Sequence, residues 1–179
     1  AEMTAAALEL LARDPDGFFL MVEGGSIDWA AHANDLPRML GEVIGFEQAF
    51  QVAQAWAADH PGTLIVVTAD HETGHLWGDG TGSFFDVNGN GIFEEGTDYA
   101  HVTDNGMNSF PGAKFHSGSH TNALVPLFAK GAGSEAFNFC VEGRDRNLKA
   151  IYDLDDSWNG KYIDNTCVYE VMMKASFAE

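Results

Sequence analysis

Basic residues are scarce in this sequence. Its 179 residues include 9 Lys and Arg against 27 Asp and Glu, which gives a formal net charge of -18. Because this charge repels phosphate backbones and anionic lipid surfaces at long range, we expect neither a nucleic-acid partner nor a membrane partner. A phosphate-bearing ligand would need local positive charge, and bound metal ions would supply it more easily than so few basic side chains.

Long apolar runs are also missing, because none approaches the roughly 20 residues that a membrane-spanning helix needs. The first residues lack the basic and apolar regions of a signal peptide, so we expect the sequence to begin inside a larger protein. Only two cysteines occur, Cys140 and Cys167. They permit one disulfide and an oxidising compartment, but two buried thiols fit the sequence equally well.

The remaining composition predicts one packed globular domain, since 45% of the residues are hydrophobic and 12% are aromatic. Apolar runs at residues 18–22 and 63–68 are typical of buried strands, and the apolar spacing at residues 36–58 is typical of an amphipathic helix. This order indicates a parallel βαβ crossover and therefore an α/β fold. Further helices are expected at residues 3–13 and 164–174, and a third strand at 124–129.

Candidate metal ligands follow the first predicted strand, where ligand sites of open α/β sheets usually form. Glu23 comes directly after this strand. Asp28 and His32 lie four residues apart, so a helical turn would place a carboxylate and an imidazole on one face, where they can share an ion. Taken alone, this pair is explained more simply as a surface Asp and His on a helix.

A second group of candidate ligands follows the second predicted strand. Asp70 and His71 stand side by side there, at the same expected sheet edge as Glu23. His120 comes just before the third predicted strand. Because His120 lies at the start of its strand and the other candidates lie at strand ends, we predict that this strand runs antiparallel to the first two.

The other histidines are weaker candidates. His60 precedes a Pro-Gly turn, and we expect it to lie at the end of a helix. The sequence leaves His75, His101 and His116 undecided, although His75 and His116 are the more plausible neighbours of the site.

Three segments resemble alkaline phosphatase signatures and occur in the order typical of that family. Residues 18–35 read FFLMVEGGSIDWAAHAND, residues 68–74 read TADHETG, and residues 120–131 read HTNALVPLFAKG. The resemblance implies a three-layer α/β/α fold with a mostly parallel sheet. It also implies that residues 1–179 form the C-terminal part of an alkaline phosphatase domain.

The same resemblance implies the ligands of three metal ions. Asp28, His32 and His120 match the ligands of one zinc, Asp70 and His71 match those of a second zinc, and Glu23 matches a magnesium ligand. His116 is the alternative to His120, which alone keeps the family's spacing to the end of the third strand. Imidazole and carboxylate ligands suit zinc, whereas magnesium prefers oxygen.

The resemblance further implies hydrolysis of small phosphate monoesters by a periplasmic or secreted enzyme that can form a homodimer. The family's serine nucleophile belongs to an N-terminal half that no segment of this sequence resembles. We therefore expect the chain to need that half as a partner and to be inactive alone.

One region departs from the family pattern. Residues from about 75 to 119 have little periodicity, and we interpret them as an insertion loop. Asp86, Asn88 and Asn90 resemble the first half of a calcium loop, but Thr97 occupies the twelfth position, where a glutamate is expected. Glu94, Glu95 or Asp98 could replace that glutamate. A calcium site and an Asn-Gly-rich turn are equally good interpretations.

Two other functions compete with phosphate monoester hydrolysis. Related phosphodiesterases or sulfatase-like hydrolases use a similar set of metal ligands, although Glu23, as a third metal carboxylate, is typical of monoesterases. An extracellular calcium-binding or adhesion module would explain the Asp86 loop, the acidity and a disulfide, but it would leave the other clusters unexplained.

Overall fold

Three α-helices open the chain, which the computed structural model describes over residues 1–80, 87–92, 94–145 and 160–176. They are α1 (Glu2–Leu11), α2 (Ser26–His32) and α3 (Leu36–Ala58). The predicted helices at 3–13 and 36–58 are thus confirmed. No helix in the described ranges is long and apolar enough to cross a membrane.

Local signals in the sequence set the ends of α3. The Asp35 carboxylate accepts a hydrogen bond from the backbone N–H of Arg38 at 3.1 Å, which caps the first turn. At the other end, His60 Nδ1 donates to the carbonyl of Trp56 at 2.7 Å, and the two rings stack 3.7 Å apart. His60 is therefore a helix-end residue, as its position before the Pro-Gly turn predicts.

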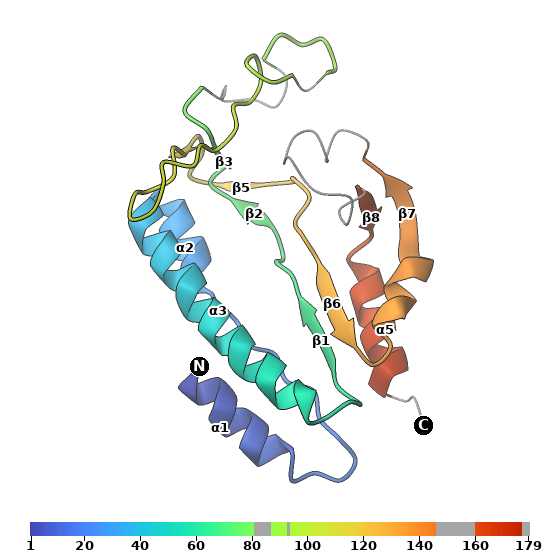
Figure 1. Cartoon of the computed structure of the whole chain (residues 1–179). Helices are drawn as coiled ribbons and strands as arrows, with labels where there is room; N and C mark the ends of the chain where they lie inside the picture. Colours follow the sequence, from blue (N-terminus) through green and yellow to red (C-terminus); the bar gives the residue numbers. More distant parts are fainter. Residues whose placement is uncertain (81–86, 93, 146–159, 177–179) are drawn as a thin grey trace.

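Two distant segments of the chain form one interrupted antiparallel ribbon, which we call the central ribbon (residues 64–77 and 114–131; Figure 1). Within it, β1 pairs with β6, β2 with β5, and β3 with β4. The strands are β1 (Leu64–Val67), β2 (Glu72–Thr73), β3 (Leu76–Trp77), β4 (Lys114–Phe115), β5 (His120–Thr121) and β6 (Phe128–Gly131).

The register of the central ribbon shifts twice. Residues 68–71 lie opposite residues 122–127, and residues 74–75 lie opposite residues 116–119. In both interruptions the returning segment carries two extra residues, which cannot all join the ladder. Such irregularities turn side chains away from the regular alternation of a strand, and they are common beside functional sites.

The predicted parallel sheet is not confirmed. Every sheet in the described part of the chain is a two-stranded antiparallel pair, and residues 18–22 belong to no strand. Without a neighbouring strand this apolar run stays open to solvent: Phe19 is 67% exposed and Met21 is 72% exposed. The antiparallel direction predicted for the strand after His120 is confirmed by the pairing of β6 with β1.

The C-terminal elements pack against one side of the central ribbon. They are the 3-10 helix η1 (Ser134–Cys140), the paired strands β7 (Val141–Arg144) and β8 (Lys161–Ile163), and α5 (Thr166–Ser176). Phe137, Cys167 and Val171 form the core of this layer, and the ribbon contributes Leu64 and Val66 to it. Because α3 contacts β1 as well, helices lie on both sides of the β1–β6 pair (Figure 1).

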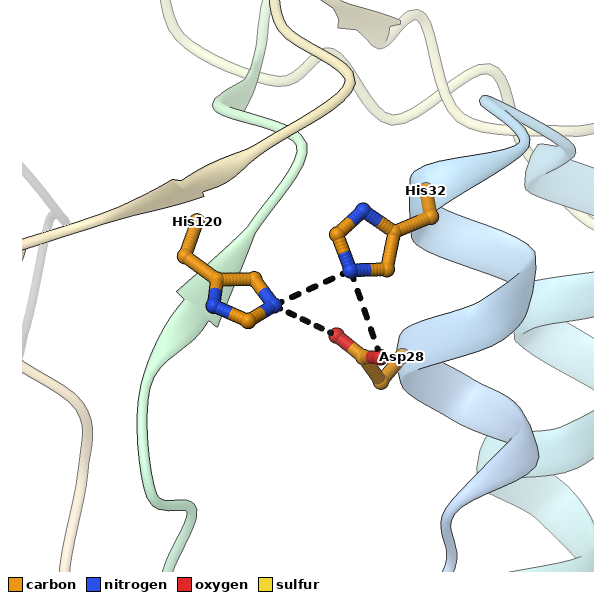
Figure 2. A group of neighbouring side chains, drawn as sticks. All are labelled: Asp28, His32 and His120. Carbon is orange, nitrogen blue, oxygen red and sulfur yellow. Dashed lines mark hydrogen bonds and ion pairs between the residues drawn. The ribbon is translucent and has the colours of Figure 1, made fainter.

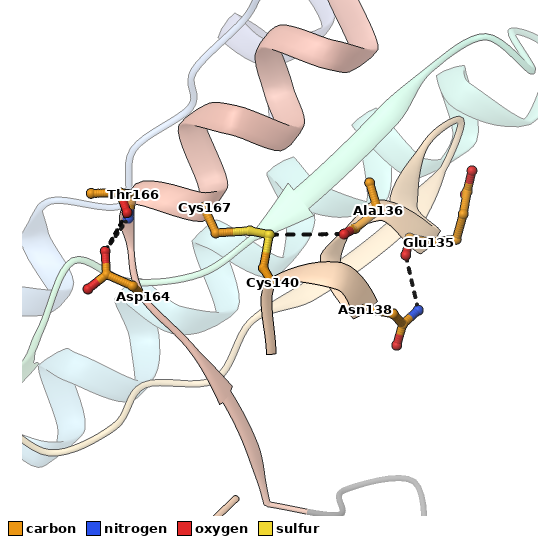
Figure 3. The surroundings of a disulfide bond; sticks show 7 residues. All are labelled: Glu135, Ala136, Asn138, Cys140, Asp164, Thr166 and Cys167. Atoms are coloured by element: carbon orange, nitrogen blue, oxygen red, sulfur yellow. Dashed lines mark hydrogen bonds between the residues drawn. A yellow bond between two sulfur atoms is a disulfide. The ribbon is translucent and has the colours of Figure 1, made fainter. Parts of the chain in front are cut away.

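A disulfide joins the two C-terminal helices. Cys140 at the end of η1 is bonded to Cys167 in the first turn of α5, so the two cysteines do pair (Figure 3). Beside the bond, the Asp164 carboxylate accepts hydrogen bonds from the backbone N–H and the hydroxyl of Thr166 and caps α5. Both hydrogen bonds lower the pKa of Asp164, and the bond from the Thr166 hydroxyl contributes more than the bond from the backbone N–H.

Removing this disulfide is expected to destabilise the chain. The two cysteines are 27 residues apart. A cross-link that closes a loop of this size lowers the conformational entropy of the unfolded chain, and so raises its free energy by about 3.5 kcal/mol. We expect replacement of both Cys140 and Cys167 by Ala to lower the free energy of unfolding by about this amount in urea titrations. A reductant should destabilise the unchanged chain equally and the double variant not at all. Equal stability of both chains without reductant would contradict this account.

Candidate metal centre

The short helix α2 presents two side chains to the site. Asp28 and His32 are one turn apart, with His32 Nε2 3.4 Å from Asp28 Oδ2. The face of the helix that carries Ala30 and Ala31 is buried, with exposed fractions of 0% and 3%. Burial of this alanine face fixes the rotation of α2, so Asp28 and His32 point toward the central ribbon.

Strand β5 brings His120 to the same place from a distant part of the sequence (Figure 2). Its Nε2 lies 3.0 Å from Nε2 of His32 and 3.5 Å from Oδ1 of Asp28. The ligand atoms of these three residues lie within 4.8 Å of one another. Asp28, His32 and His120 therefore form a group that could hold a metal ion.

A backbone carbonyl sets the ring orientation of His32. Its Nδ1 is 2.8 Å from the carbonyl oxygen of Gly118, and a carbonyl can only accept, so Nδ1 carries the proton. Nε2 of His32 then has a free lone pair when the ring is neutral, and this lone pair faces His120 and Asp28. Backbone carbonyls commonly orient metal-binding histidines in this way.

The spacing of these atoms can be compared with that of the ligands around a zinc ion. Ligands about 2.0–2.1 Å from a tetrahedral zinc are separated from each other by about 3.3 Å. Here the two imidazole nitrogens are 3.0 Å apart, His32 Nε2 is 3.4 Å from Asp28 Oδ2, and His120 Nε2 is 3.5 Å from the other carboxylate oxygen, Oδ1. Two imidazole nitrogens and a carboxylate are also ligand types that zinc accepts. The residues present thus fit zinc in their chemistry, and their ligand atoms lie close enough together to share one ion.

Asp70 and His71 lie next to this group, in the first interruption of the central ribbon. His71 Nε2 is 3.1 Å from Asp70 Oδ2, and the His71 ring stacks on His120 with 3.5 Å between ring centres. The Asp70 side chain is 86% exposed, whereas that of His71 is 28% exposed. The structure therefore brings five of the six predicted ligands into two adjoining groups.

Thr73 connects the two groups. Its hydroxyl donates to Asp28 Oδ1 at 2.6 Å, and the hydroxyl oxygen of Thr73 also lies 3.2 Å from His71 Nδ1. The hydrogen bond from Thr73 lowers the pKa of Asp28; desolvation opposes this shift, and attraction to His32, His120 and His71 adds to it. The Asp28 carboxylate is thus held in its charged form, as metal binding requires.

Gly74 lets the chain pass close behind the site. Its φ of +95° favours glycine, and a Cβ added there would lie 2.5 Å from the Phe115 ring. Its N–H donates to the Ser119 carbonyl, and its own carbonyl accepts from the N–H groups of His116 and Ser117. These bonds hold the 116–119 turn, and with it the Gly118 carbonyl that orients His32.

The sixth predicted ligand, Glu23, lies outside these groups. Its side chain is exposed and folds back toward Gly25. Of the undecided histidines, His116 has Nε2 3.3 Å from the Gly78 carbonyl and faces the buried His75 ring edge-on, while His101 pairs with Glu95 in the insertion. The structure places His120, and not His116, beside Asp28 and His32.

The predicted calcium loop is described only in part, because Asp86 lies outside the described residues. Both Asn88 and Asn90 donate their side-chain amides to the Glu94 carboxylate, at 3.2 and 2.8 Å. The fully buried Asp98 accepts from the backbone N–H groups of Val87 and Glu94 and closes the loop. Glu94 is thus in direct contact with both asparagines.

Sequence reasoning missed Thr73 and Gly118 as parts of the site. Thr73 belongs to the TADHETG segment, so its proximity in sequence was a usable signal. No sequence signal marked Gly118, because its contribution is a backbone carbonyl.

Comparison with known proteins identifies relatives of the chain. The family model described as Alkaline phosphatase matches residues 1–94. Alkaline phosphatase 3 of Bacillus subtilis is 51% identical over 73 residues, which are 41% of this chain and 16% of that protein. Alkaline phosphatase of Escherichia coli is 45% identical over 71 residues, 40% of this chain and 15% of that protein. The matches therefore span about one sixth of the curated relatives.

Solved structures extend the likeness beyond the matched sequence. The alkaline phosphatase from the Antarctic bacterium TAB5 is 34% identical, with a TM-score of 0.55, over 75% of this chain and 34% of that one. A mutant of that enzyme, with Mg bound in its M3 site, gives a TM-score of 0.56 over 75% of this chain and 35% of that one. Since the family match covers more than half of the sequence and includes Asp28, His32, Asp70 and His71, the chain belongs to the alkaline phosphatase family.

Proposed function

We propose that this chain supplies most of the metal ligands of an enzyme that hydrolyses phosphate monoesters. The observation that carries the proposal is the convergence of Asp28, His32 and His120, whose ligand atoms lie within 4.8 Å of one another and are of the types that zinc accepts. Membership of the alkaline phosphatase family supports the same conclusion.

In this proposal the residues hold two zinc ions and one magnesium ion. Asp28, His32 and His120 would bind the first zinc, Asp70 and His71 the second, and Glu23 the magnesium. Bound in pairs, zinc ions supply Lewis-acid stabilisation of the attacking and leaving oxygens in an in-line phosphoryl displacement. Glu23 would have to turn from its position near Gly25 to take part.

The chain's own residues contribute orientation and charge to this chemistry. The Gly118 carbonyl keeps the lone pair of His32 Nε2 directed into the site, and Thr73 keeps Asp28 charged and in place. The net charge of -18 would repel an anionic substrate. Metal ions bound at this position would supply the local positive charge that such a substrate needs.

Completion of the site requires a further part of the protein. We propose that the nucleophilic serine comes from the N-terminal half of the same enzyme, that the substrates are small phosphomonoesters, and that the whole protein is periplasmic or secreted and forms a homodimer. The Cys140–Cys167 disulfide supports an oxidising compartment. The phosphodiesterase and sulfatase-like alternatives would use a similar set of metal ligands without Glu23 as the third carboxylate.

The zinc site can be tested on the chain alone. Isothermal titration is expected to show zinc binding, and His120→Ala should weaken it by more than the roughly 10–100-fold that loss of an orienting partner costs. His60→Ala is the matched control, because that ring stacks on Trp56 away from the site. Equal zinc affinity in His120→Ala and the unchanged chain would rule out the proposed site.

The activity is to be tested on the chain together with its N-terminal half. We expect hydrolysis of p-nitrophenyl phosphate, abolished by a chelator and restored by zinc. Because a metal contributes several kcal/mol to the transition state, His71→Ala should lower kcat/KM by at least about 100-fold. His101→Ala, a histidine outside both groups, should leave it unchanged. Activity that resists chelators, or a sulfate ester hydrolysed faster than the phosphate ester, would refute monoesterase function.

The Asp86 loop is proposed as a separate calcium site that stabilises the insertion. The gathering of Asn88, Asn90 and Glu94 supports it, since all three carry oxygen ligands of the type calcium prefers, although the two amides donate to Glu94 here and would have to turn their oxygens to the ion. Calcium should raise the midpoint of thermal unfolding, and Glu94→Gln should remove most of that increase, whereas Glu135→Gln, on η1, should not. An increase that persists in Glu94→Gln would show that calcium binds elsewhere, as would one that disappears in His32→Ala.

A further inference from the structure

We propose that Asn34 is a positioning residue of the metal centre, because its side chain ties the end of α2 to the turn at residues 116–119. The inference rests on the proposed zinc site and adds a residue to which that proposal gives no role. Asn34 lies just beyond α2, which ends at His32 and is followed by its C-cap, Ala33.

The backbone of Asn34 ends the helix. Its φ of +54° lies in the left-handed region, where helices commonly end on glycine and sometimes on asparagine. The N–H of Asn34 donates to the Ala31 carbonyl, and the N–H of Asp35 donates to the Ala30 carbonyl, each at 2.9 Å. This pair of bonds is the Schellman ending of a helix. Because glycine adopts the left-handed conformation at lower cost, the backbone alone does not account for an asparagine at this position.

The Asn34 side chain makes a contact that glycine could not make. Its amide group faces two carbonyl oxygens, that of Ala31 in α2 and that of Ser117 in the 116–119 turn. Both oxygens can only accept, so the amide presents its NH2 group to them, and the two bonds measure 3.0 and 2.7 Å. One amide group therefore joins the last turn of α2 to the central ribbon.

This contact acts on the group that orients His32. Ser117 precedes Gly118, whose carbonyl oxygen is 2.8 Å from His32 Nδ1. The peptide between Ser117 and Gly118 is planar, so a bond that fixes the Ser117 carbonyl also limits the rotation of Gly118. On its other side the turn is held by the Ser117 N–H, which donates to the Gly74 carbonyl. The 116–119 turn is thus fixed both to the helix and to the ribbon.

The bond from Asn34 to Ser117 uses no proposed metal ligand. Helix α2 carries Asp28 and His32, and β5, which begins directly after the turn, carries His120 (Figure 2). The bond therefore holds the two ligand-bearing segments together without the help of an ion. A site that is already assembled loses less conformational freedom on binding, which raises its affinity.

Asn34→Gly tests this role, because glycine keeps the left-handed backbone and removes the amide. Asn34 is exposed, so water can replace part of its bonding. We expect zinc affinity, measured by competition with a chelating dye, to fall roughly 3–10-fold, as for the net loss of a hydrogen bond. A residue that only ended the helix would leave the affinity unchanged, since glycine ends helices as well. Asn108→Gly is the matched control, because Asn108 is another left-handed asparagine, with φ of +63°, and lies in the insertion.

A second measurement needs no metal. Hydrogen exchange of the Ser117 N–H in the metal-free chain should be roughly 3–10-fold faster in Asn34→Gly, because the turn loses its bond to α2. The exchange should not change in Asn108→Gly. Asn34→Asp has nearly the shape of asparagine but no hydrogen to donate, so it should also speed this exchange, and it replaces the glycine variant if that variant fails to fold.

Two results would overturn the inference. One is unaltered exchange of the Ser117 N–H in the Asn34 variants, and the other is unaltered zinc affinity in a folded Asn34→Gly. Failure of the unchanged chain to bind zinc would instead remove the proposed metal site, and the exchange rates would still decide whether Asn34 holds the turn.

Discussion

The site depends on the pairing of β2 with β5. Each strand has only two residues, yet their register places Thr73 opposite His120 and so joins two parts of the chain that are far apart in sequence. A slip of one residue would turn His120 to the other face of the strand, because side chains alternate. The bonds that Gly74 makes to the 116–119 turn extend this short ladder and give it a defined end.

Polar side chains gather where the central ribbon loses its regular pairing. Asp70 and His71 lie in its first interruption, and Gly118 lies in the second, on either side of the β2–β5 pair. Residues in such gaps are free of the strict alternation of a strand, so adjacent side chains can turn toward the same point. Helix α2 supplies the remaining groups from outside the ribbon, with a periodicity that places Asp28 and His32 on one face.

Much of this arrangement could be predicted from the sequence. The parts that could not be predicted depend on contacts between distant residues or on backbone groups. The spacing of Asp28 and His32 and the position of His120 before its strand were informative because both depend on local periodicity. The apolar run at 18–22 was misleading as a strand signal, since an apolar segment forms a strand only where another strand offers free backbone groups. The bond from His32 to Gly118 leaves no trace in side-chain type. The cysteine pairing depends on distant packing of α5 against η1, which a count of two cysteines leaves open.

The two ends of the segment between Trp77 and Lys114 lie side by side in space, because these two residues are partners in the β3–β4 pair. A peptide attached at two adjacent points can change length at little entropic cost, since the closure term grows only slowly with the number of residues. Related chains could therefore gain, lose or exchange this outer segment without disturbing the histidines beneath it, which makes the tip of the ribbon a natural place for variation among enzymes that share one reaction centre.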